Sequence, residues 1–213
     1  TKKVSEIDRI IMVACGTAAY AAEVGKYAIE SWARIPVSVE LSHEFRYRNP
    51  ILTPNTLVVA VSQSGETMDT LMATRYAKEA GAMVLSICNT QGATLAREAD
   101  AVLYTHAGPE VAVASTKAFT AQICVMYLLA LHLAKARNTH SLGELQDIGS
   151  ELLKLPAQIA EVLENSSSIR ELAKSYKDAK TVLFLGRNVG FPIAMEGALK
   201  LKELAYIHSE GFA

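Results

Sequence analysis

Short apolar runs rich in Val and Ile alternate along this chain with longer segments of helical periodicity, and this alternation limits the fold more than any other feature of the sequence. The runs are almost continuously hydrophobic, which is typical of parallel strands that are covered by helices on both faces. Strands are predicted at residues 10–14, 37–41, 57–61, 83–87, 101–104 and 181–185, and helices at residues 19–33, 67–80, 116–136, 142–164, 169–175 and 192–206. The pattern predicts an α/β fold, a doubly wound parallel sheet flanked by helices with flavodoxin-like layering.

The length of 213 residues is sufficient for one large domain or two small ones. The plan of an apolar strand, a glycine turn and an Ala-rich helix occurs at Gly16 and again at Gly186. We therefore expect a first domain at residues 1–135, followed at residues 136–213 by a helical linker and the beginning of a second, similar unit. That unit would hold a single strand and a single helix, so the chain is expected to be a piece of a longer protein.

The charges and the cysteines argue against several classes of protein. The formal net charge is −1, so nothing attracts the chain to nucleic acid or to an anionic membrane. The three cysteines, Cys15, Cys88 and Cys124, are widely spaced in apolar segments, which indicates buried, reduced thiols in a cytoplasmic protein rather than a disulfide framework. No CxxC motif or Cys/His cluster indicates a zinc site.

The most apolar segment of the chain covers residues 118–137. Thr120, Gln122 and His132 interrupt it, so it falls short of a continuous membrane span. We predict a helix that is buried in protein instead.

The segment SQSGET, residues 62–67, follows a predicted strand and precedes a predicted helix. Ligands of open parallel sheets bind beyond the carboxyl ends of the strands, where helix N-termini offer unpaired N–H groups to anions. The hydroxyls of this segment add neutral donors, and Gly65 lets a ligand approach the backbone closely. A small phosphorylated ligand is therefore one interpretation, and similar hydroxyl-rich segments occur at residues 15–19 and 114–120.

Ordinary N-capping explains the same residues of SQSGET without any ligand. Glu66 disfavours a phosphate here unless its side chain points away from the loop. The sequence contains no GxxxxGK[ST] motif and no GxGxxG after a strand, so neither a nucleotide P-loop nor a dinucleotide fold is supported.

A second candidate site is EGALKLKE, residues 196–203. At about 100° per residue, Glu196, Lys200 and Glu203 share one face of the predicted helix. A solvated helix face with a Glu–Lys pair is the simpler interpretation. Glu203 and Lys200 could also act together in proton transfer.

Six motifs indicate a more specific family resemblance. In chain order they are ACGTAAY, EFRYRNP, SQSGETMDT, VASTKAFT, FLGRN and EGALKLKELAYIHSE. Together they resemble the sugar isomerase (SIS) half of the glutamine–fructose-6-phosphate aminotransferase family, over nearly the whole chain. The family forms glucosamine 6-phosphate from fructose 6-phosphate and ammonia released from glutamine. The resemblance implies the isomerising part of such an enzyme, incomplete for turnover by itself.

The resemblance also implies roles for individual residues. Glu203 matches the base that moves a proton between C1 and C2 of the sugar, and Lys200 lies close to it in the family site. Residues implied to bind the hexose 6-phosphate are Thr17, Ala18, Ser62, Gln63, Ser64, Thr67, Val113 and Ser115. Family members often carry Ser at the position of Ala18, which leaves only a backbone N–H there.

The partners implied by the resemblance are a second copy of the chain in a homodimer and the glutaminase domain of the same parent chain. No metal or organic cofactor is implied. The family's ring-opening histidine, in a Lys-His-Gly-Pro stretch, and its Schiff-base lysine match no residue of this sequence, so His43, His106, His132, His140 and His208 are expected to be structural or exposed.

Two rival functions stay open at this point. A non-catalytic SIS module that senses sugar phosphates would share SQSGET, but it would not need the carboxylate of Glu203. A flavodoxin-like binding domain is disfavoured because no aromatic-rich loop follows a strand.

Overall fold

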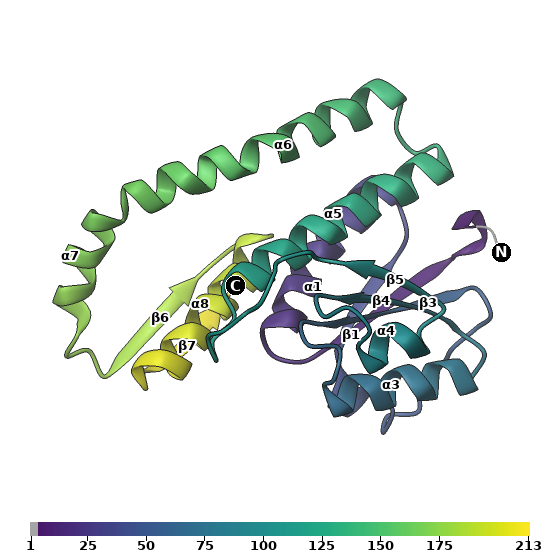
Figure 1. The fold of residues 1–213 in the computed structure, drawn as a ribbon, viewed down its shortest axis with the longest axis horizontal. Coiled ribbons are helices and arrows are strands. Elements are labelled where there is room, and N and C mark those ends of the chain that lie inside the picture. The colour runs from purple at the N-terminus through teal and green to yellow at the C-terminus, as the bar shows by residue number, and fades with distance from the viewer. Residues whose placement is uncertain (1–3) are drawn as a thin grey trace.

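A computed structural model describes residues 4–213, and its N-terminal part is a five-stranded parallel sheet (Figure 1). The strand order β2-β1-β3-β4-β5 is that of a flavodoxin-like doubly wound sheet, so the predicted fold class is confirmed. Each predicted strand of this sheet is present, with ends that differ by at most one residue. The strands are β1 (Arg9–Ala14), β2 (Val37–Leu41), β3 (Thr56–Ser62), β4 (Met83–Cys88) and β5 (Ala101–Tyr104).

Helices cover both faces of the sheet because successive side chains of the strands point to opposite sides. Ile10 and Met12 pack into one buried cluster together with Met126, whereas Ile11 and Val13 pack into the other. The first cluster is covered by α1 (Thr17–Ala28), its π-helical extension η2 (Ile29–Ala33) and α5 (Lys117–Arg137), with η1 (Val4–Glu6) beside α5. The second is covered by α2 (Ser42–Phe45), α3 (Met68–Glu79) and α4 (Thr94–Glu98).

Helix α5 is the apolar segment that the sequence predicted to be buried in protein. Among the helices of residues 4–213, only this one has the length and the apolar composition that a membrane span requires. In its most apolar stretch, 39% of the residues are buried inside the protein. The buried residues lie at helical spacing on one face and include Gln122, Met126 and Ala130. This face packs against α1 and the sheet, so the prediction of a core helix is confirmed for that face.

The C-terminal part begins with two helices, α6 (Leu142–Glu164) and α7 (Ser166–Tyr176), which extend away from the sheet as a long arm (Figure 1). Ser141 and Glu144 form a capping box at the start of α6, and Pro156 lies inside the helix. The chain then returns through β6 (Thr181–Leu185), α8 (Gly190–Ala205) and β7 (His208–Phe212).

Strand β7 corrects the expectation of a second unit with one strand. It pairs in parallel with β6, in a register that sets Thr181 against His208. The repeated plan of strand, glycine turn and helix is confirmed, because β1 and α1 flank Gly16 as β6 and α8 flank Gly186. Helix α8 lies against α1, and this contact brings the two parts of the chain together.

Candidate active site

A cavity of about 240 Å³ lies where the chain leaves β1 and β3. These two neighbouring strands continue to helices on opposite faces of the sheet, and such a switch point is where open α/β sheets bind ligands. The cavity brings together every residue that the sequence predicted to bind a sugar phosphate. These residues are Thr17, Ala18, Ser62, Gln63, Ser64, Thr67, Val113 and Ser115.

Hydrogen bonds made by its own hydroxyl groups fix the conformation of loop 62–67. Ser62 Oγ accepts a hydrogen bond from Gly65 N (3.1 Å) and shares another with Thr67 Oγ1 (3.0 Å). Ser64 Oγ accepts from Glu66 N at 3.1 Å. Thr67 stands at the N-cap of α3, yet its side chain makes no capping hydrogen bond to that helix. Simple N-capping therefore does not explain the loop, and the start of α3 is free to donate to an anion.

Gly65 is required by the geometry of this loop. Its φ of +67° is unfavourable for other residues, and a Cβ there would lie 2.6 Å from Ala93 Cβ. Leu95 N donates to Gly65 O at 3.0 Å, so the loop is fixed to the start of α4. The backbone of the loop is thus positioned before any ligand binds.

Glu66 does not oppose an anion in the cavity. Its Oε1 accepts a hydrogen bond from Thr94 N at 2.7 Å, at the start of α4, and the residue is not part of the cavity wall. Hydrogen bonds from Thr94, the backbone one first, hold the pKa of Glu66 below its usual value. The condition set by the sequence, that this side chain point away, is met.

Helix α5 does not offer the free N-terminus that residues 114–120 suggested. Glu110 Oε2 accepts from Ala118 N at 3.0 Å and from Thr116 N at 3.3 Å, so a carboxylate of the chain itself occupies the start of this helix. Burial of Glu110 opposes ionisation, but these hydrogen bonds outweigh it and lower its pKa. The start of α5 is therefore already occupied, although Val113 and Ser115 just before it line the cavity.

Lys200 joins α8 to the wall of the cavity. Its Nζ donates to Thr17 Oγ1 at 2.9 Å and to Glu203 Oε2 at 2.6 Å. Thr17 Oγ1 in turn donates to Glu196 Oε1 at 3.1 Å, which lies 3.3 Å from Lys200 Nζ. The predicted common face of Glu196, Lys200 and Glu203 is confirmed. Their side chains are 8%, 20% and 37% exposed, so the alternative of a solvated face fails for the first two.

Glu196 is the residue of this network that sequence reasoning left out of the site. Burial raises its pKa, and the nearby ammonium of Lys200 opposes this shift without cancelling it. Its Oε2 is buried and has no hydrogen-bond partner. Its spacing of four residues from Lys200 was the signal that could have identified it.

Gln122 is a second residue that was missed as part of the site. It lines the cavity from α5, and its Oε1 is buried without a hydrogen-bond partner. The available signal was a polar residue in an otherwise apolar helix. Cys15, Val61, Thr70, Glu110 and Ala112 complete the wall.

The histidines and cysteines are mostly where the sequence placed them. Four histidines are exposed and His140 is half-buried. All three cysteines are free, but only Cys88 is buried, so the expectation of burial is wrong for Cys15 and Cys124. Burial raises the pKa of the Cys88 and Cys124 thiols.

Comparisons with known proteins agree with the motifs. A model of the SIS domain family matches residues 3–132. The chain is 65% identical, over 207 residues, to glutamine–fructose-6-phosphate aminotransferase (isomerizing) of Leifsonia xyli. The match spans 97% of this chain and 34% of that protein. It is 60% identical over 208 residues to the protein of the same name from Streptomyces coelicolor, with 98% and 34% covered. The chain thus spans about a third of the length of the curated relatives it matches.

Solved structures extend the similarity to the arrangement of the elements. The C-terminal domain of glucosamine-fructose-6-phosphate aminotransferase from Francisella tularensis superposes with a TM-score of 0.96 at 39% identity, over 98% of this chain and 59% of that one. Tagatose-6-phosphate ketose/aldose isomerase from Escherichia coli superposes with a TM-score of 0.74 at 20% identity, over 98% of this chain and 57% of that one. This similarity shows a shared fold only. The resemblance indicated by the sequence motifs is confirmed.

Proposed function

The chain belongs to the SIS domain family, and from this premise we propose that it is the hexose 6-phosphate-binding and proton-transferring part of a glutamine–fructose-6-phosphate aminotransferase. In the whole protein, fructose 6-phosphate and ammonia from glutamine would give glucosamine 6-phosphate. The two relatives of this name from Leifsonia xyli and Streptomyces coelicolor are 65% and 60% identical to the chain over the matched region, which supports the assignment.

The phosphate of the sugar would bind in loop 62–67. Neutral donors are concentrated there: the hydroxyls of Ser62, Ser64 and Thr67, and the uncapped N–H groups at the start of α3. Such donors bind a phosphate without the strong attraction of a fixed positive charge, so a product can also leave. Gln63, Ser115 and the backbone N–H of Ala18 would border the same ligand.

The carbon atoms of the sugar would extend from this phosphate toward Thr17 and α8. Glu203 would take a proton from C1 of the open-chain ketose as general base and return it at C2. The hydroxyl proton on C1 would move to the oxygen on C2, so that the carbonyl passes to C1 and the ketose becomes the aldose. The contact that carries this proposal is the pair of hydrogen bonds from Lys200 Nζ to Thr17 Oγ1 and Glu203 Oε2. It connects the wall of the phosphate cavity to the carboxylate.

The same assignment brings partners that belong to the proposal. We expect a homodimer and a glutaminase domain in the same parent chain, as the resemblance to the aminotransferases implies. A cytoplasmic location is consistent with three free cysteines among the described residues.

Calorimetry with the 213-residue chain tests the ligand class. Fructose 6-phosphate should bind, unphosphorylated fructose should bind at least about tenfold more weakly, and inorganic phosphate should compete. A charged hydrogen-bonding group is worth roughly 1.5–3 kcal/mol, which corresponds to at least this factor. Equal affinity for the two sugars would contradict a phosphate site. A module that only senses sugar phosphates would pass this test, so proton transfer needs a separate measurement, the exchange of the C1 hydrogen of the sugar with solvent.

A further inference from the structure

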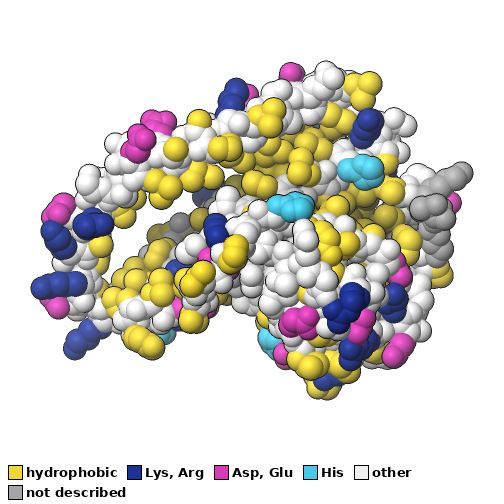
Figure 2. Space-filling model, in the orientation of Figure 1, with side chains coloured by type: hydrophobic (Ala, Val, Ile, Leu, Met, Phe, Trp, Pro, Cys, Tyr) yellow, Lys and Arg dark blue, Asp and Glu magenta, His cyan; other side chains and the backbone are white. Residues whose placement is uncertain are grey.

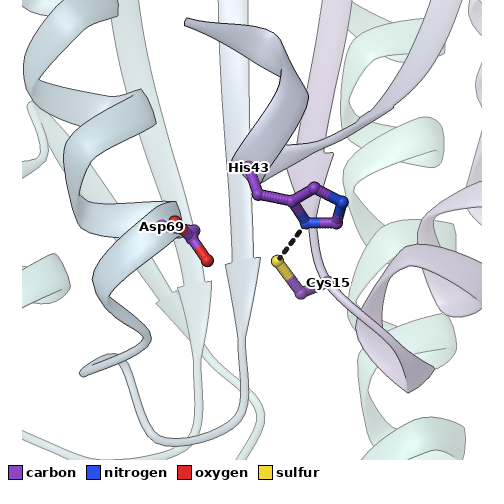
Figure 3. A group of neighbouring side chains, drawn as sticks. All are labelled: Cys15, His43 and Asp69. Atoms are coloured by element: carbon purple, nitrogen blue, oxygen red, sulfur yellow. Dashed lines mark hydrogen bonds between the residues drawn. The ribbon is translucent and has the colours of Figure 1, made fainter. Parts of the chain in front are cut away.

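Three side chains with different metal-binding atoms converge beside the cavity, at the same edge of the sheet. Cys15 follows β1, His43 lies on the short helix α2, and Asp69 lies in the first turn of α3 (Figure 3). The sulfur of Cys15 is 3.8 Å from His43 Nδ1. One ligand atom of each residue lies within 4.8 Å of the other two. The function proposed above gives none of these three side chains a chemical role, although Cys15 also lines the cavity.

These distances are close to what a tetrahedral zinc ion requires. Zinc lies about 2.3 Å from thiolate sulfur, about 2.0–2.1 Å from imidazole nitrogen and about 2.0–2.2 Å from carboxylate oxygen. In a tetrahedron these lengths set the ligand atoms about 3.4–3.6 Å apart. The sulfur–nitrogen distance is already near this value, and the remaining adjustment is on the order of 1 Å.

We propose that Cys15, His43 and Asp69 form a three-ligand site for Zn²⁺ next to the sugar-phosphate cavity. A thiolate and a carboxylate together neutralise the two positive charges of the ion, and the thiol proton leaves to solvent when the metal binds. A soft sulfur ligand selects zinc over Mg²⁺ and Ca²⁺, which prefer oxygen. The fourth position is left to water or to a ligand, as in zinc sites with three protein residues.

The surroundings of the cluster suit such an ion. His43 Nε2, the nitrogen that would stay free of metal, lies 3.9 Å from Glu44 Oε1. This distance is too long for a hydrogen bond, but it places a carboxylate beside the nitrogen that metal-bound histidines commonly use to donate to one. His43 is exposed, while Cys15 and Asp69 are half-buried, so an ion can enter from solvent. Cys15 also lines the cavity, so the ion would lie near the bound sugar phosphate.

The test is a titration of the untagged, metal-free chain with Zn²⁺ by calorimetry, and with Co²⁺ by absorption spectroscopy. One Zn²⁺ per chain should bind, and Co²⁺ should give the thiolate-to-metal charge-transfer band that reports a cysteine ligand. Cys15→Ser, His43→Gln and Asp69→Asn should each weaken Zn²⁺ binding about 100-fold or more. Changing even a residue that only hydrogen-bonds to a metal ligand typically weakens metal binding about 10–100-fold. Mg²⁺ and Ca²⁺ should not compete.

Matched controls are Cys124→Ser, which removes another half-buried free thiol, and His132→Gln, which removes another exposed histidine. Both should bind Zn²⁺ as the unchanged chain does. Because His43 is exposed, His43→Gln should fold normally even if a change at Cys15 disturbs the site. Unchanged zinc affinity in His43→Gln or Cys15→Ser, or equal losses in the controls, would overturn the proposal. The result does not depend on whether the cavity binds a sugar.

Discussion

Lys200 Nζ donates a hydrogen bond to Thr17 Oγ1 at 2.9 Å, although 183 residues separate the two in the sequence. Thr17 begins α1, at the carboxyl end of β1, and Lys200 lies on α8, so the contact joins the first sheet to the second unit. Glu203 is held to the same ammonium at 2.6 Å. The candidate site is therefore composite, and neither unit contains the phosphate loop and the carboxylate together.

The hydroxyls of loop 62–67 should contribute directly to affinity for a hexose 6-phosphate. We expect Ser62→Ala and Thr67→Ala each to weaken binding about tenfold or more, because each removes a hydrogen bond worth roughly 1.5–3 kcal/mol to a charged group. Calorimetry with fructose 6-phosphate measures the change. Ser150→Ala, on α6 and outside the cavity, is the control and should bind normally. Unchanged affinity in both cavity variants would contradict the phosphate assignment.

Gly65→Ala should destabilise the fold. A side chain at φ +67° is strained, and its Cβ would approach Ala93 Cβ to 2.6 Å. We expect a loss of about 1–3 kcal/mol in the free energy of unfolding, measured with denaturant. The control is Gly149→Ala inside α6, where a Cβ meets nothing within 4 Å. That variant should gain up to about 1 kcal/mol from helix propensity. A neutral Gly65→Ala would show that the loop is not fixed as described.

The buried carboxyl of Glu196 should make stability depend on pH. In the unfolded chain this carboxyl has a pKa of about 4.5, and burial raises the pKa in the folded state. At a pH between these two pKa values, the folded state keeps a proton that the unfolded chain has released. The contribution is complete below pH 4.5 and is lost as pH rises through the folded pKa. The free energy of unfolding of the unchanged chain, minus that of Glu196→Gln, should therefore fall from pH 4.5 to 7. The slope reaches about 1.4 kcal/mol per pH unit when the states differ by one full proton. A difference that rises with pH would contradict the raised pKa.

The arm of α6 and α7 should pack against a second copy of the chain. Apolar side chains are exposed along it (Figure 2). Among them are Leu153, Val162 and Leu163, whose exposed fractions are 82%, 61% and 66%. Light scattering coupled to size exclusion should give twice the chain mass of 23.0 kDa. Leu153→Asp combined with Leu163→Asp should yield monomers with unchanged helix content. A dimer that survives both changes would exclude this surface as the interface.

The strands of the first sheet could be predicted from the sequence because their hydrophobicity is nearly continuous. Helix α6 was predicted with its observed ends, despite Pro156 inside it, because its periodic pattern is long and its capping signals are strong. The short helices α2 and α4 escaped prediction, since four or five residues are too few to show a period. Strand β7 escaped it because HSEGF has almost no strand character. Pairing with β6 and packing against α8 hold it extended, and both are tertiary contacts that the local sequence does not show.

The site could be predicted only in part, and for a related reason. Loop 62–67 and the helix 196–203 carry local motifs, so candidate residues could be named there from the sequence. The role of Glu110 at the start of α5 could not. The meeting of Cys15, His43 and Asp69 depends on three strand-to-helix connections that reach one edge of the sheet. No spacing along the chain reports such a meeting.

The role of Glu203 as the base is tested most directly by exchange of the C1 hydrogen of fructose 6-phosphate with solvent deuterium, followed by NMR in the full-length parent protein. Glu203→Gln keeps the size of the side chain but removes the basic carboxylate, and general base catalysis is typically worth about 10²–10⁴ in rate. In this variant exchange should fall by at least about 100-fold at saturating sugar phosphate, with affinity nearly unchanged. Lys202→Gln, one residue away on a different face of α8, should exchange at the normal rate. Normal exchange in Glu203→Gln would show that Glu203 is not the base, and the chain would then be a module that binds sugar phosphates without moving their protons.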